Sequence, residues 1–157
     1  MDQSDWNARV AKVAEAGEVA RLLHNFNTEF DTPSPGPEIL VERLKTLMPT
    51  NNTFAILAGV PAVALALVTL RTNVWYEGRV ALLDELYVEP QLRGKGIGSA
   101  IVAQLLTTAR TLGVDSIEVG VDEVDIDARR FYTRHGFSST DPESTERSFA
   151  IFQELST

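Results

Sequence analysis

Residues 91–100 read Gln91-Leu92-Arg93-Gly94-Lys95-Gly96-Ile97-Gly98-Ser99-Ala100 and lie between two apolar segments. The segment before them, 80–88, is predicted to be a strand. The segment after them is predicted to be a helix that ends near residue 112 and buries Ile97, Ile101, Leu105 and Leu112. Glycines at alternate positions let the backbone approach a ligand closely and turn several amide N–H groups toward one point. The unpaired N–H groups at the start of the helix face the same point. The stretch therefore predicts a binding turn for a phosphate or pyrophosphate.

The spacing of these glycines does not fit two common nucleotide sites. A Walker loop requires Gly, four residues, and then Gly-Lys-Ser or Gly-Lys-Thr, and the chain has no such run. A dinucleotide fingerprint requires its glycines directly after a strand and an acidic residue about 20 positions later, at the end of the next strand. Here residues 89–93 separate the strand from the glycines, and Asp115 begins the next predicted strand instead of ending it. The dinucleotide fingerprint is therefore not matched.

The turn and its surroundings resemble the GNAT superfamily of N-acetyltransferases, whose acetyl-CoA motif is Gln/Arg-x-x-Gly-x-Gly/Ala. Gln91, Gly94 and Gly96 fit this motif, and Gly98 is a frequent addition. The resemblance covers nearly the whole chain and is strongest from residue 82 to residue 137.

A second family signature, Asn-x-x-Ala-x-x-x-Tyr followed by Gly-Phe, is matched by Ala128, Tyr132 and residues 136–137. Asp125 stands where the family usually has Asn, and its other interpretation is a helix N-cap. The resemblance implies acetyl-CoA as the cofactor, held by residues of both motifs and of the preceding strand. These are Leu86, Tyr87, Val88, Arg93, Gly94, Lys95, Gly96, Ile97, Gly98, Ser99, Asp125, Ala128 and Tyr132.

The order of predicted elements is β-α-α-β-β-β-α-β-α-β-β, an α/β arrangement with a mixed sheet. We expect a single domain over residues 1–157 with a GNAT-like three-layer fold: a mixed, mostly antiparallel central sheet flanked by helices. The resemblance implies that the sheet is splayed at a bulge in the central strand near residues 86–88. The predicted strands are 8–13, 53–58, 62–70, 80–88 and 116–121, with the last ones supplied by 137 and 148–155; the predicted helices are 15–26, one from 37 to about 47, 96–112 and 126–134.

Three residues are candidates for proton transfer. A tyrosine hydroxyl stays protonated at neutral pH and can donate to a departing thiolate, and the resemblance implies this role for Tyr132. Asp84 and Glu85 lie in an apolar strand, where a carboxylate is costly without a partner or a task. We expect Glu85 to be the base that takes the proton of the attacking amine, with Asp84 orienting or binding it. Which of the two acts as base stays open, as does a purely structural ion pair for one of them.

The segment 73–88 is similar to diamine (polyamine) acetyltransferases, which have a Trp-x-x-Gly-like turn and a Leu-acid-acid-Leu-Tyr-Val strand. This similarity implies that Trp75 and Tyr76 join Asp84 and Glu85 in binding the substrate. The alternative is that Trp75 and Tyr76 cover a sheet edge or form a contact in a homodimer.

Composition limits the class of protein. The net charge of −8 argues against nucleic-acid binding and mildly favours a small cationic amine as the acceptor. The chain has no cysteine to carry an acyl group and no apolar run of membrane-spanning length, and residues 1–6 do not resemble a signal peptide. We therefore expect a cytoplasmic protein without a membrane partner.

His24 and His135 have no second ligand at metal spacing, so no metal is expected.

The leading hypothesis is an enzyme that moves an acetyl group from acetyl-CoA to a primary amine by direct attack in a ternary complex. One alternative is an acyl-CoA-binding regulatory or structural module without turnover. Another is an acetyltransferase that acts on the amine of a protein or peptide.

Overall fold

The computed structural model describes residues 6–140 and 151–155, and it divides into two compact units, 1–119 and 120–157. The first unit contains the sheet and three α-helices, and the second contains one α-helix. In chain order the elements are β1 (Arg9–Val10), η2 (Val13–Glu15), α1 (Ala16–Glu29), α2 (Pro37–Leu47), β2 (Thr53–Ala58), β3 (Ala64–Arg71), β4 (Val80–Val88), η3 (Pro90–Leu92), α3 (Ile97–Thr111), β5 (Ser116–Val119) and α4 (Ile126–Arg134).

The sheet of the first unit has five strands in the order β1-β2-β3-β4-β5. The first three pairings are antiparallel and the pairing of β4 with β5 is parallel. A parallel pair needs a crossover connection, and α3 provides it. The predicted mixed, mostly antiparallel sheet is confirmed.

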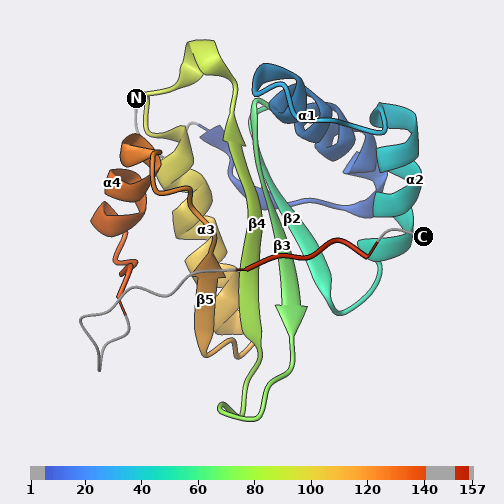
Figure 1. Cartoon of the computed structure of the whole chain (residues 1–157). Coiled ribbons are helices and arrows are strands. Elements are labelled where there is room, and N and C mark those ends of the chain that lie inside the picture. Colours follow the sequence, from blue (N-terminus) through green and yellow to red (C-terminus); the bar gives the residue numbers. More distant parts are fainter. Residues whose placement is uncertain (1–5, 141–150, 156–157) are drawn as a thin grey trace. The chain divides into compact units, whose positions relative to one another are not determined.

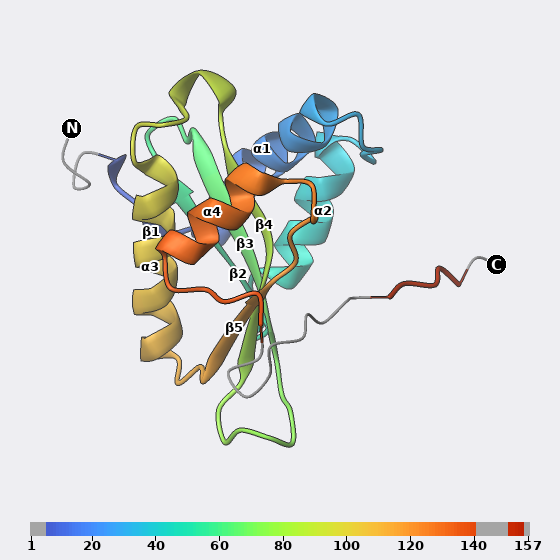
Figure 2. The ribbon, with the colours of Figure 1, turned by 60° about the vertical axis from the view of Figure 1, so that its left-hand side comes forward.

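Helices cover both faces of this sheet, α1 and α2 on one face and α3 on the other (Figures 1 and 2). The cluster beneath α1 and α2 combines their apolar side chains with residues that point to that face from β2, β3 and β4, among them Leu57, Leu65 and Tyr87. Alternate residues of a strand point to opposite faces, so the sheet supplies a second buried face for Ile97, Ile101 and Leu105 of α3. The three-layer arrangement of the first unit is thus the one expected.

One extra residue interrupts the pairing of β4 with β3. Leu67 faces Glu85 and Val68 faces Leu83, so Asp84 has no opposite residue in β3 and forms a bulge. In a regular strand, positions 83 and 87 would share a face. The bulge reverses the alternation, so Tyr87 enters the cluster beneath α1 and α2 while Leu83 is buried outside it. The sheet is therefore irregular at residue 84, earlier than the expected position near residues 86–88.

Two expectations about the sequence were wrong. Phe137 and residues 151–155 are not in strands, and residues 148–150 lie outside the described residues. The apolar residues of this segment favour a strand, but a strand also needs a neighbour, and none pairs with them in the described part of the chain. The second wrong expectation concerns Leu112, which was expected to be buried by the helix. It is 43% exposed because α3 ends at Thr111, before the helix can turn this side chain toward the sheet.

Gly78 joins the β3–β4 connection to the connection between α3 and β5. Its N–H donates to Oδ2 of Asp115 at 2.6 Å, and its carbonyl accepts from Nδ2 of Asn73 at 3.1 Å. A Cβ at position 78 would lie 2.6 Å from Asp115 Oδ2 and would also meet the carbonyl oxygen of Gly113. No side chain fits there unless the backbone moves.

We therefore expect Gly78→Ala to lower the free energy of unfolding by about 1–3 kcal/mol, the usual cost of overpacking. Urea denaturation followed by circular dichroism measures this change. Gly17→Ala is the matched control, because a Cβ at this position in α1 meets nothing within 4 Å. Alanine favours helix over glycine by up to about 1 kcal/mol, so the control should not lose stability. Equal stability of the Gly78→Ala and wild-type proteins would contradict the packing argument.

Candidate active site

The glycine-rich turn leaves open space in front of its backbone. Gly94 has a φ of 78° and Gly96 a φ of 85°, values that L side chains rarely adopt. A Cβ added to either glycine would meet no atom within 4 Å. Glycine is therefore required by the backbone conformation, and the space that a side chain would fill is left for a ligand.

The N–H groups of this turn are available for hydrogen bonding. In residues 6–140 and 151–155, the backbone N–H groups of Gly94, Lys95 and Gly96 donate to no backbone acceptor. The first helical hydrogen bond of α3 runs from Ala100 N–H to Gly96 O at 3.1 Å, and no side chain caps the helix. Open space, free donors and the positive end of the α3 dipole fit a pyrophosphate group such as that of CoA. The predicted residues Gly94–Ser99 are brought together here.

The side chain of Arg93 is held against Glu29 of α1. Its Nη2 lies 2.8 Å from Oε1 of Glu29, its Nε donates to Val88 O at 3.0 Å, and its guanidinium lies 5.7 Å from the ring centroid of Tyr87. Arg93 was predicted to bind the cofactor. In this structure its charge is paired with Glu29, so the open side of the turn is formed mainly by backbone.

Glu85 and Asp84 differ in their surroundings. Glu85 is half-buried, and burial, with a smaller contribution from the neighbouring Asp84 carboxylate, raises the pKa of Glu85. Asp84 is exposed and accepts a hydrogen bond from the hydroxyl of Thr69. A carboxyl group with a raised pKa can accept a proton more readily than an ordinary one. Of the two candidates, Glu85 therefore has the carboxyl group with the raised pKa, and its role as the base stays a prediction.

Trp75 and Tyr76 lie in the connection before β4, whereas the glycine-rich turn follows its end (Figure 1). Their backbone N–H groups both donate to Oδ1 of Asn73 at 2.8 Å, which fixes the tip of the connection. Trp75 is 86% exposed. The structure does not bring these two side chains together with the turn, and their role in substrate binding stays a prediction.

The second unit carries the other predicted motif on α4. Asp125 is the N-cap of this helix, since its Oδ1 accepts from Ala128 N–H at 3.0 Å. The capping interpretation of Asp125 is therefore confirmed. The ring of Tyr132 packs edge-on against Phe131 and Phe137, with centroid distances of 5.2 and 5.5 Å. These contacts fix the orientation of Tyr132 within its own unit.

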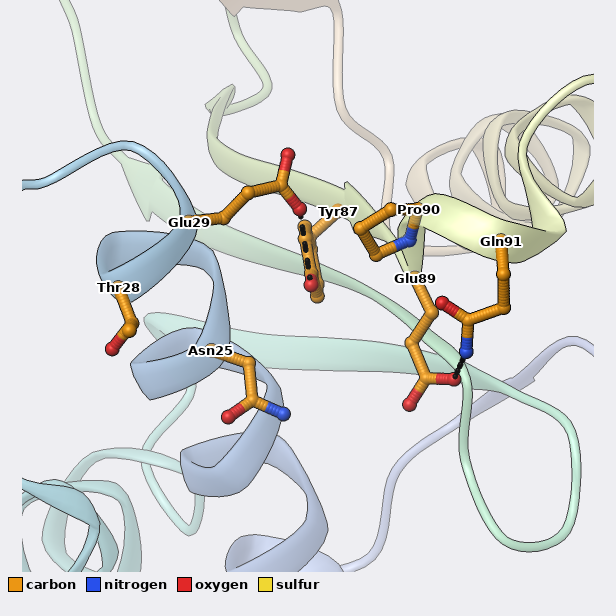
Figure 3. Close-up of a pocket in the computed structure, with 7 residues that line it drawn as sticks. All are labelled: Asn25, Thr28, Glu29, Tyr87, Glu89, Pro90 and Gln91. Carbon is orange, nitrogen blue, oxygen red and sulfur yellow. Dashed lines mark hydrogen bonds between the residues drawn. The ribbon is translucent and has the colours of Figure 1, made fainter.

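An open pocket that the sequence motifs did not indicate lies between α1 and the end of β4 (Figure 3). Its lining residues have polar side chains, apart from Pro90. They come from α1, the end of β4 and the segment after β4 that includes η3: Asn25, Thr28, Glu29, Tyr87, Glu89, Pro90 and Gln91. The sequence contains one indication of this pocket: residues 25, 28 and 29 are polar and are spaced i, i+3, i+4, so they share one face of α1 beside its apolar face. Nothing local in the sequence pairs this helix face with β4.

Neither a metal site nor a membrane span was found in the part of the chain that the structure describes. Within residues 6–140 and 151–155, no three His, Asp or Glu side chains are arranged to hold a metal ion. No helix in the same ranges is long and apolar enough to cross a membrane.

Comparison with known proteins identifies the family. A model described as the Acetyltransferase (GNAT) family matches residues 19–137. A crystal structure assigned as an acetyltransferase from Arthrobacter sp. FB24 is 45% identical, covers 94% of this chain and 95% of that one, and has a TM-score of 0.89. The chain therefore belongs to the GNAT family of acetyltransferases.

More distant relatives agree at the level of fold or of short segments. An aminoglycoside acetyltransferase from an uncultured soil metagenomic sample, in complex with sisomicin, is 19% identical with a TM-score of 0.79, covering 99% of this chain and 100% of that one. Mycothiol acetyltransferase of Beutenbergia cavernae is 32% identical over 72 residues, 44% of this chain. An uncharacterized N-acetyltransferase of Methanocaldococcus jannaschii is 36% identical over 58 residues, 37% of this chain. The matched stretches span about a quarter of these two curated relatives, 24% and 26%.

If the turn binds CoA, Gly96→Glu should abolish acetyl-CoA binding, because it fills the open space and adds negative charge where a pyrophosphate would lie. Calorimetric titration with acetyl-CoA measures the affinity, and circular dichroism shows whether the variant is folded.

Gly113→Glu is the matched control for this variant. Gly113 follows the other end of α3, has a φ of 69° and also faces open space. It therefore shares the backbone strain but not the location, and it should bind acetyl-CoA as the wild type does. A folded Gly96→Glu protein with unchanged affinity, or equal loss in both variants, would contradict the assignment of the turn.

Proposed function

We propose that this chain transfers an acetyl group from acetyl-CoA to the primary amine of a small cationic molecule by direct attack in a ternary complex. The observation that carries the proposal is the half-buried carboxyl group of Glu85, with its raised pKa, on β4. The same strand leads into a glycine-rich turn in which the N–H groups of residues 94–96 donate to no backbone acceptor among the described residues. A base and an anion-binding turn joined through one strand are what acetyl transfer from CoA to an amine requires.

The residues that would hold the cofactor are the backbone of Gly94–Ser99 and the end of β4, Leu86–Val88. When bound, acetyl-CoA supplies an acetyl group activated as a thioester. β5 pairs with β4 only over Val80–Leu83, so in the described part of the first unit residues 85–88 have a strand neighbour on one side only. Their outward peptide groups could bind an amide-containing chain in the way a strand does.

The proton balance of the reaction indicates which roles the side chains must fill. Forming the amide removes one proton from the nitrogen of a neutral amine, and releasing CoA as a thiol requires one proton at the sulfur. An acceptor nitrogen that arrives as an ammonium group first loses one further proton to solvent. We assign removal of the first to a carboxylate oxygen of Glu85 and delivery of the second to the hydroxyl of Tyr132. Asp84, held by Thr69, is assigned to orienting the amine. No covalent intermediate on the protein is needed, and the chain has no cysteine that could form one.

The charge of the chain supports a cationic acceptor. The net charge is −8, and the sequence around the candidate base contains two further carboxylates, that of Asp84 on β4 and that of Glu89 directly after the end of the strand. Carboxylates that line a cleft raise the local concentration of cations and steer their approach.

An acceptor screen tests the proposed function directly. The full chain is incubated with acetyl-CoA and single amines, among them diamines, amino sugars, sisomicin, amino acids and N-terminal peptides, and released thiol is measured with a thiol-reactive dye. The expected best acceptor is a small cation whose kcat/KM falls as salt rises, because exposed charges are screened beyond about 10 Å at 0.1 M salt. A best acceptor with net negative charge would contradict the cationic preference. Binding of acetyl-CoA without thiol release from any amine would favour a binding module.

Glu85→Gln should lower kcat/KM by about 10²-fold or more and should remove part of its pH dependence. Glu85 accepts a proton only when ionised. In the wild type, kcat/KM should therefore rise with pH through the pKa of Glu85, which lies above the ordinary value of about 4.3 for a glutamate. The control is Glu42→Gln, on the exposed face of α2 beside Lys45, which should leave the profile unchanged.

Tyr132→Phe separates the two proton transfers, since it should lower kcat without changing the affinity for acetyl-CoA. An unchanged pH profile in Glu85→Gln would exclude Glu85 as the base, whatever Tyr132→Phe does.

A further inference from the structure

The backbone of the glycine-rich turn makes few hydrogen bonds of its own. Residues 93–96 are exposed, and the N–H groups of residues 94–96 donate to no backbone acceptor among the described residues. The preceding N–H, that of Arg93, donates to Pro90 O at 3.4 Å, a bond that stays within η3 and its cap. After the turn, the buried side chain of Ile97 anchors the start of α3. The side of the turn that precedes Gly94 therefore depends on side chains for its position.

The side chain of Arg93 connects this side of the turn to two other elements. Its Nε donates to Val88 O at the end of β4 at 3.0 Å, and its Nη2 donates to Oε1 of Glu29 on α1 at 2.8 Å. Its guanidinium also lies 5.7 Å from the ring centroid of Tyr87, within the range of a cation–π contact. The rigid, planar fork of an arginine is suited to serving two acceptors at once. We call these contacts of Arg93 with Glu29, Val88 and Tyr87 the Arg93 brace.

The far end of the Arg93 brace is itself held in place. Oε1 of Glu29 also accepts from the Tyr87 hydroxyl at 3.4 Å (Figure 3), and Tyr87 is 5% exposed. The Tyr87 ring packs against Phe26 of α1 at a centroid distance of 5.1 Å. Burial, and then the Glu29 carboxylate, raise the pKa of Tyr87, so its hydroxyl keeps its proton and can donate at neutral pH. The brace therefore ties the turn to a packed part of the core.

The surroundings of the Glu29–Arg93 pair distinguish it from an ordinary surface ion pair. An isolated, exposed pair contributes little to stability. Here the side chain of Glu29 is only 25% exposed, and both partners make a further hydrogen bond, Glu29 with Tyr87 and Arg93 with Val88. Charge-assisted hydrogen bonds are stronger than neutral ones. Because the pair joins residues 64 apart in the chain, it fixes the turn relative to α1 in a way that no local contact does.

We propose that Arg93 is a positioning residue for the cofactor, which acts through Glu29 to hold the backbone donors of residues 94–96 in the geometry that binds a pyrophosphate. This inference rests on the proposed use of acetyl-CoA. A turn that is already ordered loses less conformational freedom when a ligand binds, and its N–H groups are already aimed at the anion. The role differs from that of a direct phosphate ligand, for which Glu29 would be a competitor.

The test uses two variants that break the Arg93 brace without changing the charge of the chain, Arg93→Lys and Glu29→Asp. A lysine does not reproduce the fork, and an aspartate is shorter than a glutamate by one methylene group. Calorimetric titration of the full chain with acetyl-CoA should give an affinity lower by about fivefold or more in each variant. Because both residues act through one contact, the double variant should lose about as much as the weaker-binding single variant. If Arg93 bound the phosphate directly, Glu29→Asp would leave the affinity unchanged or raise it.

A second readout, made without ligand, separates positioning from general damage. The NMR order parameters of the amides of residues 94–96 should fall in both variants, whereas those of β2 and β3 should stay at their wild-type values. Arg110→Lys, at an exposed position near the end of α3, is the control for the arginine variant. Glu42→Asp, which loosens the ion pair with Lys45 on α2, is the control for the glutamate variant. Both controls should keep the wild-type affinity and order parameters.

Unchanged or tighter binding of acetyl-CoA by a folded Glu29→Asp protein would overturn the inference. Weaker binding with unchanged order parameters in the turn would also overturn it, as would order parameters that fall throughout the sheet. If Glu29→Asp does not fold, Arg93→Lys decides by the same two readouts. If the wild type does not bind acetyl-CoA, the proposed function and the cofactor role of the brace both fail. If the wild type transfers acetyl groups while the variants bind acetyl-CoA equally well, only the brace is excluded.

Discussion

The extra residue in β4 is the constraint on which the rest of the first unit depends. Up to Leu83 the strand pairs with neighbours on both sides, and after Asp84 only β3 pairs with it in the described residues. Backbone N–H and C=O groups need partners, and the outward groups of residues 85–88 have none from β5. The same bulge turns Glu85 and Tyr87 to the α1–α2 face. One inserted residue thus creates both an unpaired strand edge and the row of side chains that would face an acceptor.

Local patterns predicted most of the fold. The bounds of β2, β4 and α4 agree with the predicted ranges, because turn residues and periodicity define such segments from within. Failures occur where the outcome depends on distant residues. Residues 151–155 include apolar residues that favour a strand, yet a strand exists only with a partner. The position of the bulge depends on which face Leu83 and Tyr87 must share with residues of other elements, and no pattern within β4 contains that information.

The candidate site follows the same division. Glycines at 94 and 96 and the cap at Asp125 satisfy local backbone requirements, so the sequence alone could predict them. The contact of Arg93 with Glu29 joins residues 64 apart, and the contact of Tyr87 with Glu29 joins residues 58 apart. A basic residue in a phosphate-binding motif is naturally assigned to the phosphate. Only the fold reveals that the guanidinium is already paired with a carboxylate of α1.

The glycine-rich turn and the pocket beside α1 expose different kinds of chemical groups, and this difference determines how each of them tolerates substitution. The glycine-rich turn offers backbone groups, whose positions depend on φ values that few substitutions preserve. The pocket offers side chains on a solvent-facing stretch of helix, where Asn25 and Thr28 hold no other element in place. Single changes at positions 25 and 28 should therefore cost little stability, whereas a side chain at position 94 or 96 strains the backbone. Glu29 is under a double constraint, because replacing it alters the pocket and also releases Arg93 from the helix.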